Sequence, residues 1–227
     1  MLLIYTPKLN SRIDYAIEVC FKHVVKLDYR ITSDLVEFEK STDPCLWYAQ
    51  EKVSKKPGII ADAMMFDNKI LINSPGRVIE EGIMVLFPTE TVRLAKFDLF
   101  AATFWHVTRM EEYECLAKDV HHRFNSEMSI ARKIGILQKP IVNIWVKLIL
   151  DELSLLYPDL SYEKPSYKFL PTIDVDSIYM YKSKGLYRTL GGIARDILRK
   201  NFPAVKKRFQ VLLGKEPDPW FCFNANK

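Results

Sequence analysis

The chain has 227 residues, 48% of them hydrophobic and 27% charged, so it is a globular protein able to bury one large or two small cores. Its eight glycines disfavour a glycine-rich phosphate-binding loop, and its four scattered cysteines lack a C-x-x-C pair, which argues against a zinc knuckle or a small disulfide framework. The net charge of +5 is uneven, because residues 177–227 hold 11 Lys and Arg against 3 Asp and Glu, which leaves residues 1–176 with a net charge of −3.

The N-terminus has no basic stretch before its short apolar run, so no export signal is expected. Residues 141–156 form the most apolar stretch of the chain, but Lys147, Asp151 and Glu152 interrupt it at helical spacing. This pattern fits an amphipathic helix better than a membrane span. We therefore expect a cytoplasmic protein that does not span a membrane.

The first predicted elements form a β-α-β unit. Residues 2–6 read as a short apolar strand, and residues 11–26 show apolar side chains at helical spacing behind Ser11, a suitable N-cap. Residues 27–32 read as a second strand. Because a helical crossover joins them, the two strands should pair in parallel.

Shorter elements follow. Apolar runs at 46–49, 69–73 and 83–87, separated by Pro-Gly turns, predict short strands. The apolar periodicity predicts helices over residues 96–114 and 141–157 and a strand over residues 166–173. It also predicts two basic amphipathic helices, over residues 186–200 and 203–213. The fold class is therefore α/β: a short open mixed sheet covered by helices over residues 1–160, followed by a second domain over residues 166–227.

A polar cluster lies at the end of the helix predicted over 96–114 and in the loop after it. Its members are Arg109, Glu111, Glu112, Tyr113, His121, His122, Arg123 and Phe124. Adjacent histidines usually point in different directions, and histidine pairs that bind metal more often have i, i+4 spacing on a helix. We expect an ion-paired helix end, in which Arg109 and Arg123 meet Glu111 or Glu112, rather than a metal site.

Two carboxylates end the strand predicted over 166–173. Asp174 and Asp176 are spaced i, i+2, which in a strand places both side chains on one face. Paired carboxylates form half of a divalent-metal or acid-base site. No histidine follows them to complete such a site.

Five sequence blocks stand out together: residues 97–104, 109–113, 121–124, 135–145 and 171–176. In these blocks the chain resembles a bacterial protein family in which a domain of unknown function precedes a NodB-like polysaccharide deacetylase domain. The resemblance covers nearly the whole chain and keeps the order of the blocks.

The resemblance implies roles for the two aspartates. In such deacetylases a Thr-Phe-Asp-Asp motif ends the first barrel strand, so Asp174 is the candidate general base that deprotonates a metal-bound water. The metal-binding carboxylate is displaced past Val175 to Asp176. In such deacetylases a later His-x-x-x-His motif, which this chain lacks, supplies two further zinc ligands. His122 stands where the resemblance predicts glycine, which argues against a tightly shaped loop there.

The resemblance also implies that the barrel is incomplete, because only two helices follow its first motif. Zinc is then expected in the complete protein and no cofactor in this chain, which should not catalyse deacetylation alone. The expected role is that of an accessory N-terminal region in carbohydrate metabolism, partnered by a deacetylase domain in cis or in trans.

Other interpretations stay open. The Asp-x-Asp pair also suits a haloacid-dehalogenase-type phosphatase, with Asp174 as nucleophile and Asp176 as its acid-base partner, or a metal-dependent glycosyltransferase. A stand-alone glycan- or protein-binding module is the non-catalytic alternative. The basic tail is either a solvated helix face or a surface for glycan or another anionic polymer, for a membrane surface or for an acidic neighbouring domain. No nucleic-acid-binding signature accompanies it.

Overall fold

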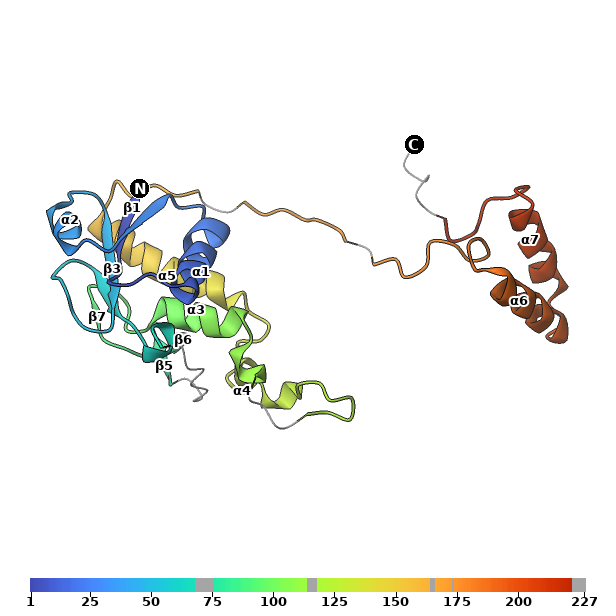
Figure 1. Ribbon diagram of the computed structural model, residues 1–227, viewed down its shortest axis with the longest axis horizontal. Coiled ribbons are helices and arrows are strands. Elements are labelled where there is room, and N and C mark those ends of the chain that lie inside the picture. The colour runs from blue at the N-terminus through green and yellow to red at the C-terminus, as the bar shows by residue number, and fades with distance from the viewer. Residues whose placement is uncertain (68–75, 114–117, 164–165, 173, 222–227) are drawn as a thin grey trace. The chain divides into compact units, whose positions relative to one another are not determined.

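The computed structural model describes residues 1–67, 76–113, 118–163, 166–172 and 174–221 (Figure 1). The chain divides into two compact units, Met1–Ser166 and Tyr167–Lys227. The strand expected at 69–73 lies outside the described residues.

A five-stranded sheet organises the first unit, in the order β2-β1-β3-β4-β7. The strands β1 (Leu2–Tyr5), β2 (Tyr29–Thr32), β3 (Cys45–Ala49) and β4 (Gly58–Ile60) pair in parallel, and β7 (Thr91–Val92) runs antiparallel to β4. A separate hairpin joins β5 (Arg77–Glu80) to β6 (Ile83–Leu86). The predicted α/β class, mixed sheet and opening β-α-β unit are confirmed.

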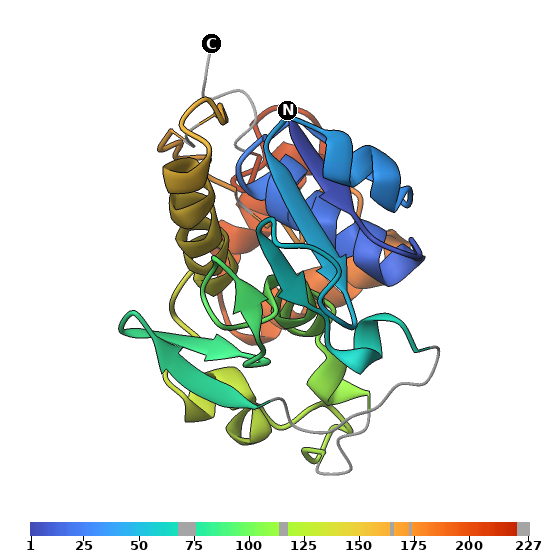
Figure 2. The same cartoon turned by 90° about the vertical axis from the view of Figure 1, so that its left-hand side faces the viewer.

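Helices cover both faces of this sheet (Figure 2). One face carries α1 (Ser11–Ile17) with its π-helical continuation η1 (Glu18–Val24), and also α3 (Leu99–Val107) and α5 (Ile141–Leu156). The other face carries α2 (Leu35–Lys40). Every residue of β1 and β3 is buried, as parallel strands covered on both faces require.

The first helix does not begin as predicted. Its N-cap is Asn10 and not Ser11, because the Asn10 side chain accepts hydrogen bonds from the N–H groups of Arg12 and Ile13, both at 3.0 Å. Asn10 also donates to the carbonyl oxygen of Met65 at 2.8 Å. The Asn10 side chain thus caps the helix with its oxygen and holds it to the loop after β4 with its N–H group.

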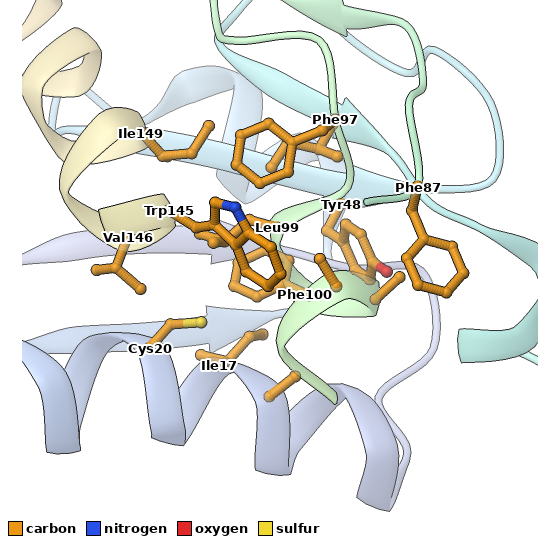
Figure 3. Close-up of a cluster of buried hydrophobic side chains, with 14 of the residues drawn as sticks. Ile17, Cys20, Tyr48, Phe87, Phe97, Leu99, Phe100, Trp145, Val146 and Ile149 are labelled. Carbon is orange, nitrogen blue, oxygen red and sulfur yellow. The ribbon is translucent and has the colours of Figure 1, made fainter. Parts of the chain in front are cut away.

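Aromatic residues dominate the larger core (Figure 3). Phe100 of α3 meets Tyr48 of β3 edge to face at 4.9 Å between ring centroids, and Trp145 of α5 packs near Phe97. The indole N–H of Trp145 donates to the carbonyl oxygen of Met84 at 2.9 Å, which holds α5 to the β5–β6 hairpin. Large buried rings therefore tie the sheet, two helices and the hairpin together.

The helix predicted over 96–114 ends early. Its last residue is Val107, and Arg109 adopts a left-handed conformation, with φ of 55°, that no α-helix can continue. Short turns follow instead: η3 (Met110–Glu112), η4 (Ser126–Met128) and α4 (Ile130–Lys133). This break creates the concave surface described below.

The second unit contains two helices, α6 (Leu186–Leu198) and α7 (Phe202–Leu212), which pack side by side (Figure 1). Both were predicted. The strand predicted at 166–173 is not formed over residues 166–172, where Tyr167, Phe169 and Leu170 are exposed. Among the described helices of the whole chain, none is long and apolar enough to cross a bilayer.

Candidate functional site

The two aspartates singled out by sequence lie in an exposed segment of the second unit. Asp174 and Asp176 are both exposed, and neither belongs to a strand. The geometric argument for a shared strand face therefore does not apply to them. Their roles as general base and metal ligand stay predictions.

The described residues do not fit a zinc site of the expected kind. Within them, no group of three or more His, Cys, Asp and Glu side chains lies close enough together to hold a metal ion. Zinc in proteins usually has at least three protein ligands. The motif implied by the resemblance would supply two of them as histidines. Two exposed carboxylates do not provide this coordination.

A polar cleft instead forms after the end of α3, in the segment that leads to α4. Figure 1 shows where this segment lies in the first unit. Its volume is about 720 Å³. The lining residues come from η3 and from the loop after it, and they are Arg109, Glu112, Lys118, Asp119, His122, Arg123, Phe124, Asn125 and Ser126. The cleft therefore brings together most of the polar cluster singled out by sequence.

Asp119 organises the loop on one side of this cleft. Its carboxylate accepts hydrogen bonds from the backbone N–H groups of His121 at 2.8 Å and Arg123 at 2.9 Å, and from Nε of Arg123 at 2.9 Å. Lys118 and Phe124 form an antiparallel bridge that closes the loop. The bond from the Arg123 backbone, followed by those from its side chain and from His121, lowers the pKa of Asp119 against the opposing effect of burial. The loop is thus held by an ionised carboxylate.

The ion pairs of the cleft agree with the prediction for one arginine and not for the other. Arg109 pairs with Glu112, as expected. Arg123 pairs with Asp119 at 2.8 Å and not with Glu111 or Glu112, because the loop closes on itself. Glu111 accepts from the Ser129 hydroxyl at 3.0 Å and from the Ile130 N–H at 2.8 Å, so it joins η3 to α4.

His122 corrects a further expectation. Its φ is 60°, the left-handed region that favours glycine, and its N–H donates to the carbonyl oxygen of Asp119 at 2.9 Å. The loop is therefore tight although the chain has histidine where the resemblance predicts glycine. The backbone keeps a shape that glycine would adopt with less strain.

Replacing His122 with glycine should raise the free energy of unfolding of the first unit by about 0.5–1 kcal/mol. Removing Cβ relieves a left-handed strain of about 1–2 kcal/mol, and the greater freedom of glycine in the unfolded chain offsets part of that gain. Urea unfolding followed by circular dichroism measures the change. His121→Gly is the matched control, because His121 has no positive φ, and it should lower stability slightly. A stability loss in both variants would contradict the strain argument.

A second polar arrangement lies near the carboxyl ends of the parallel strands. Asp98 caps α3 by accepting from the Ala101 N–H at 2.9 Å. Its other oxygen accepts from the Tyr48 hydroxyl at 2.8 Å and from the Asp62 N–H at 2.7 Å. Asp98 is fully buried, and burial raises its pKa to about 7 although the three hydrogen bonds favour the anion.

This arrangement is structural. Open α/β sheets commonly bind ligands in the crevice at the carboxyl ends of their strands. Here Asp98 already uses both oxygens to join α3, β3 and the loop after β4. The polar cleft beside α4 is therefore the better candidate for ligand binding in the first unit.

Sequence reasoning missed several of these residues. Asp98 stands immediately before an apolar helical run, which is a recognisable N-cap signal. Asp119 and Asn125 carry no comparable signal, because their roles depend on a loop closure that appears only in three dimensions. Lys118 also lacks a sequence signal for a functional role, since an isolated lysine in a polar loop is usually solvated.

The comparisons with known proteins add one finding. No curated protein and no solved structure matches the chain. The sequence profile of a family of unknown function, DUF7033, matches residues 2–158, which include the whole sheet and the cleft. The chain therefore belongs to the DUF7033 family.

Proposed function

We propose that the first unit is a non-catalytic, glycan-binding accessory module of a polysaccharide deacetylase-like protein. The observation that carries this proposal is the polar cleft beside α4. Two of the blocks behind the resemblance, residues 109–113 and 121–124, contribute its lining, whereas residues 97–104 and 135–145 mainly serve the core.

The chemistry of the cleft suits a ligand rich in hydroxyl groups. Sugar hydroxyls both donate and accept, and the cleft offers donors on Arg109 and Arg123 beside acceptors on Glu112 and Asp119. The ion pairs hold these groups in place and leave little net charge, which favours polar ligands over strongly charged ones. Phe124 adds an apolar surface against which a sugar ring can pack. The cleft volume lies within the usual range for small-ligand sites.

Binding of a chito-oligosaccharide to the full chain, measured by isothermal titration calorimetry, tests the proposal. Arg123→Gln should weaken binding at least tenfold, because it removes a charged donor at the cleft. Arg132→Gln is the matched control, since Arg132 pairs with Glu127 at 2.7 Å and does not line the cleft. The absence of binding to the wild type, or equal weakening in both variants, would refute the proposal.

The proposal includes a partner and a place in the cell. The partner is a deacetylase domain, in cis or in trans, and zinc is proposed only for the complete protein, where Asp176 would contribute one ligand. The second unit is proposed as the start of a deacetylase-type barrel, and a cytoplasmic location remains part of the proposal. The buried free thiols of Cys20 and Cys45 are compatible with a reducing compartment.

The phosphatase and glycosyltransferase alternatives have less support. Both need Asp174 and Asp176 on one face at the end of a buried strand. Residues 166–172 form no strand, and both aspartates are exposed. The described geometry therefore favours the binding module over either reaction.

A further inference from the structure

The second unit contains a cationic cavity that the proposed glycan site does not use. It has a volume of about 380 Å³ and lies at the α6–α7 hairpin. Its lining combines four cationic residues with two aromatic rings, and the residues are Met180, Tyr181, Lys184, Arg188, Gly191, Gly192, Arg195, Arg208 and Trp220. No acidic side chain is among them.

Arg208 forms the buried floor of this cavity. Only 6% of the residue is exposed, and its Nη2 pairs with Asp196 at 2.7 Å. The Tyr181 ring lies 4.7 Å from the guanidinium carbon and covers one of its faces. The Nε–H of Arg208 is buried and has no acceptor among the described residues. A buried cationic donor without an acceptor is costly unless a ligand supplies one.

The sequence keeps space open for this guanidinium. A Cβ on Gly192 would lie 2.7 Å from Nη1 of Arg208 and 2.8 Å from its central carbon. Helix α6 therefore has glycine where any other residue would displace the arginine. This close approach gives Gly192 a reason to be in a helix interior, where glycine normally costs up to about 1 kcal/mol.

The wall of the cavity is fixed by a second buried acid. Asp218 accepts backbone hydrogen bonds from Met180 at 2.7 Å, Tyr181 at 2.8 Å and Trp220 at 3.2 Å. Burial favours its neutral form, but these N–H donors, together with that of Lys182, hold the pKa of Asp218 below its usual value. The two aromatic residues are thus positioned by the backbone around one carboxylate.

Three further cations line the same cavity. Lys184 lies 5.6 Å from the centre of the Trp220 ring. Nε of Arg195 lies 3.6 Å from the carboxylate of Asp196, which also forms the ion pair with Arg208. Arg188 has no acidic partner among the residues described. The carboxylates of Asp196 and Asp218 therefore adjoin four cations, which still leaves an excess positive charge suited to a divalent anion.

From this geometry we propose that the second unit binds a phosphate monoester whose ring packs against Trp220. Arginine recognises phosphate through paired N–H donors, and the unpartnered Nε–H of Arg208 supplies such a donor at the floor. Trp220 is 51% exposed and lies at the wall, so a ring attached to the phosphate can stack on it. This site goes beyond the glycan-binding role proposed for the first unit and does not depend on it.

Calorimetric titration of the full chain with inorganic phosphate, phenyl phosphate and benzoate tests the proposal. We expect phenyl phosphate to bind most tightly, inorganic phosphate more weakly, and benzoate at least tenfold more weakly than phenyl phosphate. Trp220→Leu should remove the difference between the two phosphates, because only the ring contacts the indole. Equal binding of benzoate and phenyl phosphate would overturn the assignment of a divalent phosphate ligand.

Charge variants separate a built site from general attraction. Arg208→Gln should weaken phosphate binding at least tenfold, and Arg188→Gln should weaken it severalfold. Lys206→Gln is the matched control, because Lys206 is an exposed cation on α7 that does not line the cavity. Its affinity should stay within twofold of wild type.

Two outcomes would overturn the proposal. One is the absence of phosphate binding to the wild-type chain. The other is an equal loss of affinity in Arg188→Gln and Lys206→Gln, which would mean that net charge alone attracts the ion. Arg208→Gln removes a buried ion pair and can therefore unfold the hairpin, so circular dichroism must accompany it. Arg188→Gln decides the result if that variant fails to fold.

Discussion

Replacing Asp98 with alanine should lower the free energy of unfolding by about 4 kcal/mol. The variant loses the N-cap of α3, which contributes about 1 kcal/mol. It also leaves the buried Tyr48 hydroxyl and the Asp62 N–H without an acceptor, at about 1–3 kcal/mol each. Urea unfolding of the two proteins measures the difference.

The matched control is Asp34→Ala. Asp34 caps α2 by accepting from the N–H groups of Val36 and Glu37, but these bonds are exposed to solvent. Its loss should therefore cost only about 1 kcal/mol. Equal costs at both positions would show that burial of Asp98 is not the source of its large effect.

The same residue predicts a pH dependence. Burial raises the pKa of Asp98 to about 7, whereas an aspartate in the unfolded chain titrates near 3.9. The folded state therefore keeps a proton that the unfolded state releases between these values. The stability contribution of this proton is fully present below about pH 4 and is lost as the pH rises through about 7.

The isosteric variant Asp98→Asn isolates this contribution. The unfolding free energy of the wild type should fall by up to about 4 kcal/mol more than that of the variant between pH 4 and pH 8. The difference between the two proteins removes the effect of all other titrating groups. Parallel pH profiles would contradict a raised pKa at Asp98.

Gly58→Ala should lower the free energy of unfolding by about 3 kcal/mol. Gly58 pairs with Trp47 across β3 and β4, and a Cβ there would lie 2.0 Å from Cε2 of the indole. Trp47 is fully buried, and its indole N–H donates to the carbonyl oxygen of Lys56 at 2.8 Å, so the ring has little freedom to move. Overpacking of this kind typically costs about 1–3 kcal/mol, and the close approach places this case at the upper end.

A double-mutant cycle with Trp47→Leu checks the cause. Gly58→Ala should cost at least 1 kcal/mol less in the Trp47→Leu background, because the smaller side chain leaves room for the methyl group. Denaturant unfolding of the four proteins gives the coupling energy. Equal costs in both backgrounds would mean that the alanine does not meet the indole.

The sequence predicted the parts of the fold that depend on local apolar periodicity. The opening β-α-β unit, α5, α6 and α7 all have long or clear patterns, and each is present. The strands β4 and β7 have three and two residues, too few to display a period, so only their neighbours in the sheet define them. Helix α2 was missed for the same reason, since it spans only six residues.

Other errors came from contacts that no local pattern encodes. The apolar run before Asp174 resembles a buried strand, but a strand requires a neighbour with which to pair, and residues 166–172 have none. In the cleft, the ion pair of Arg109 with Glu112, three residues along the chain, was predicted correctly. The ion pair of Arg123 with Asp119 was not predicted, because it depends on the closure of the loop. The cavity around Arg208 depends on the packing of two helices. The sequence predicted the positive charge of this region but not the cavity.

The left-handed turn at His122 belongs to a wider feature of this chain. At least eight residues other than glycine have a positive φ, among them Lys26, Glu81 and Ser183, whereas the whole sequence has only eight glycines. Each such turn holds strain that a single codon change to glycine would relieve. Lys26, Glu81 and Ser183 are exposed and line neither proposed binding surface, so changing them to glycine gives an untapped margin of heat resistance that leaves the core unaltered.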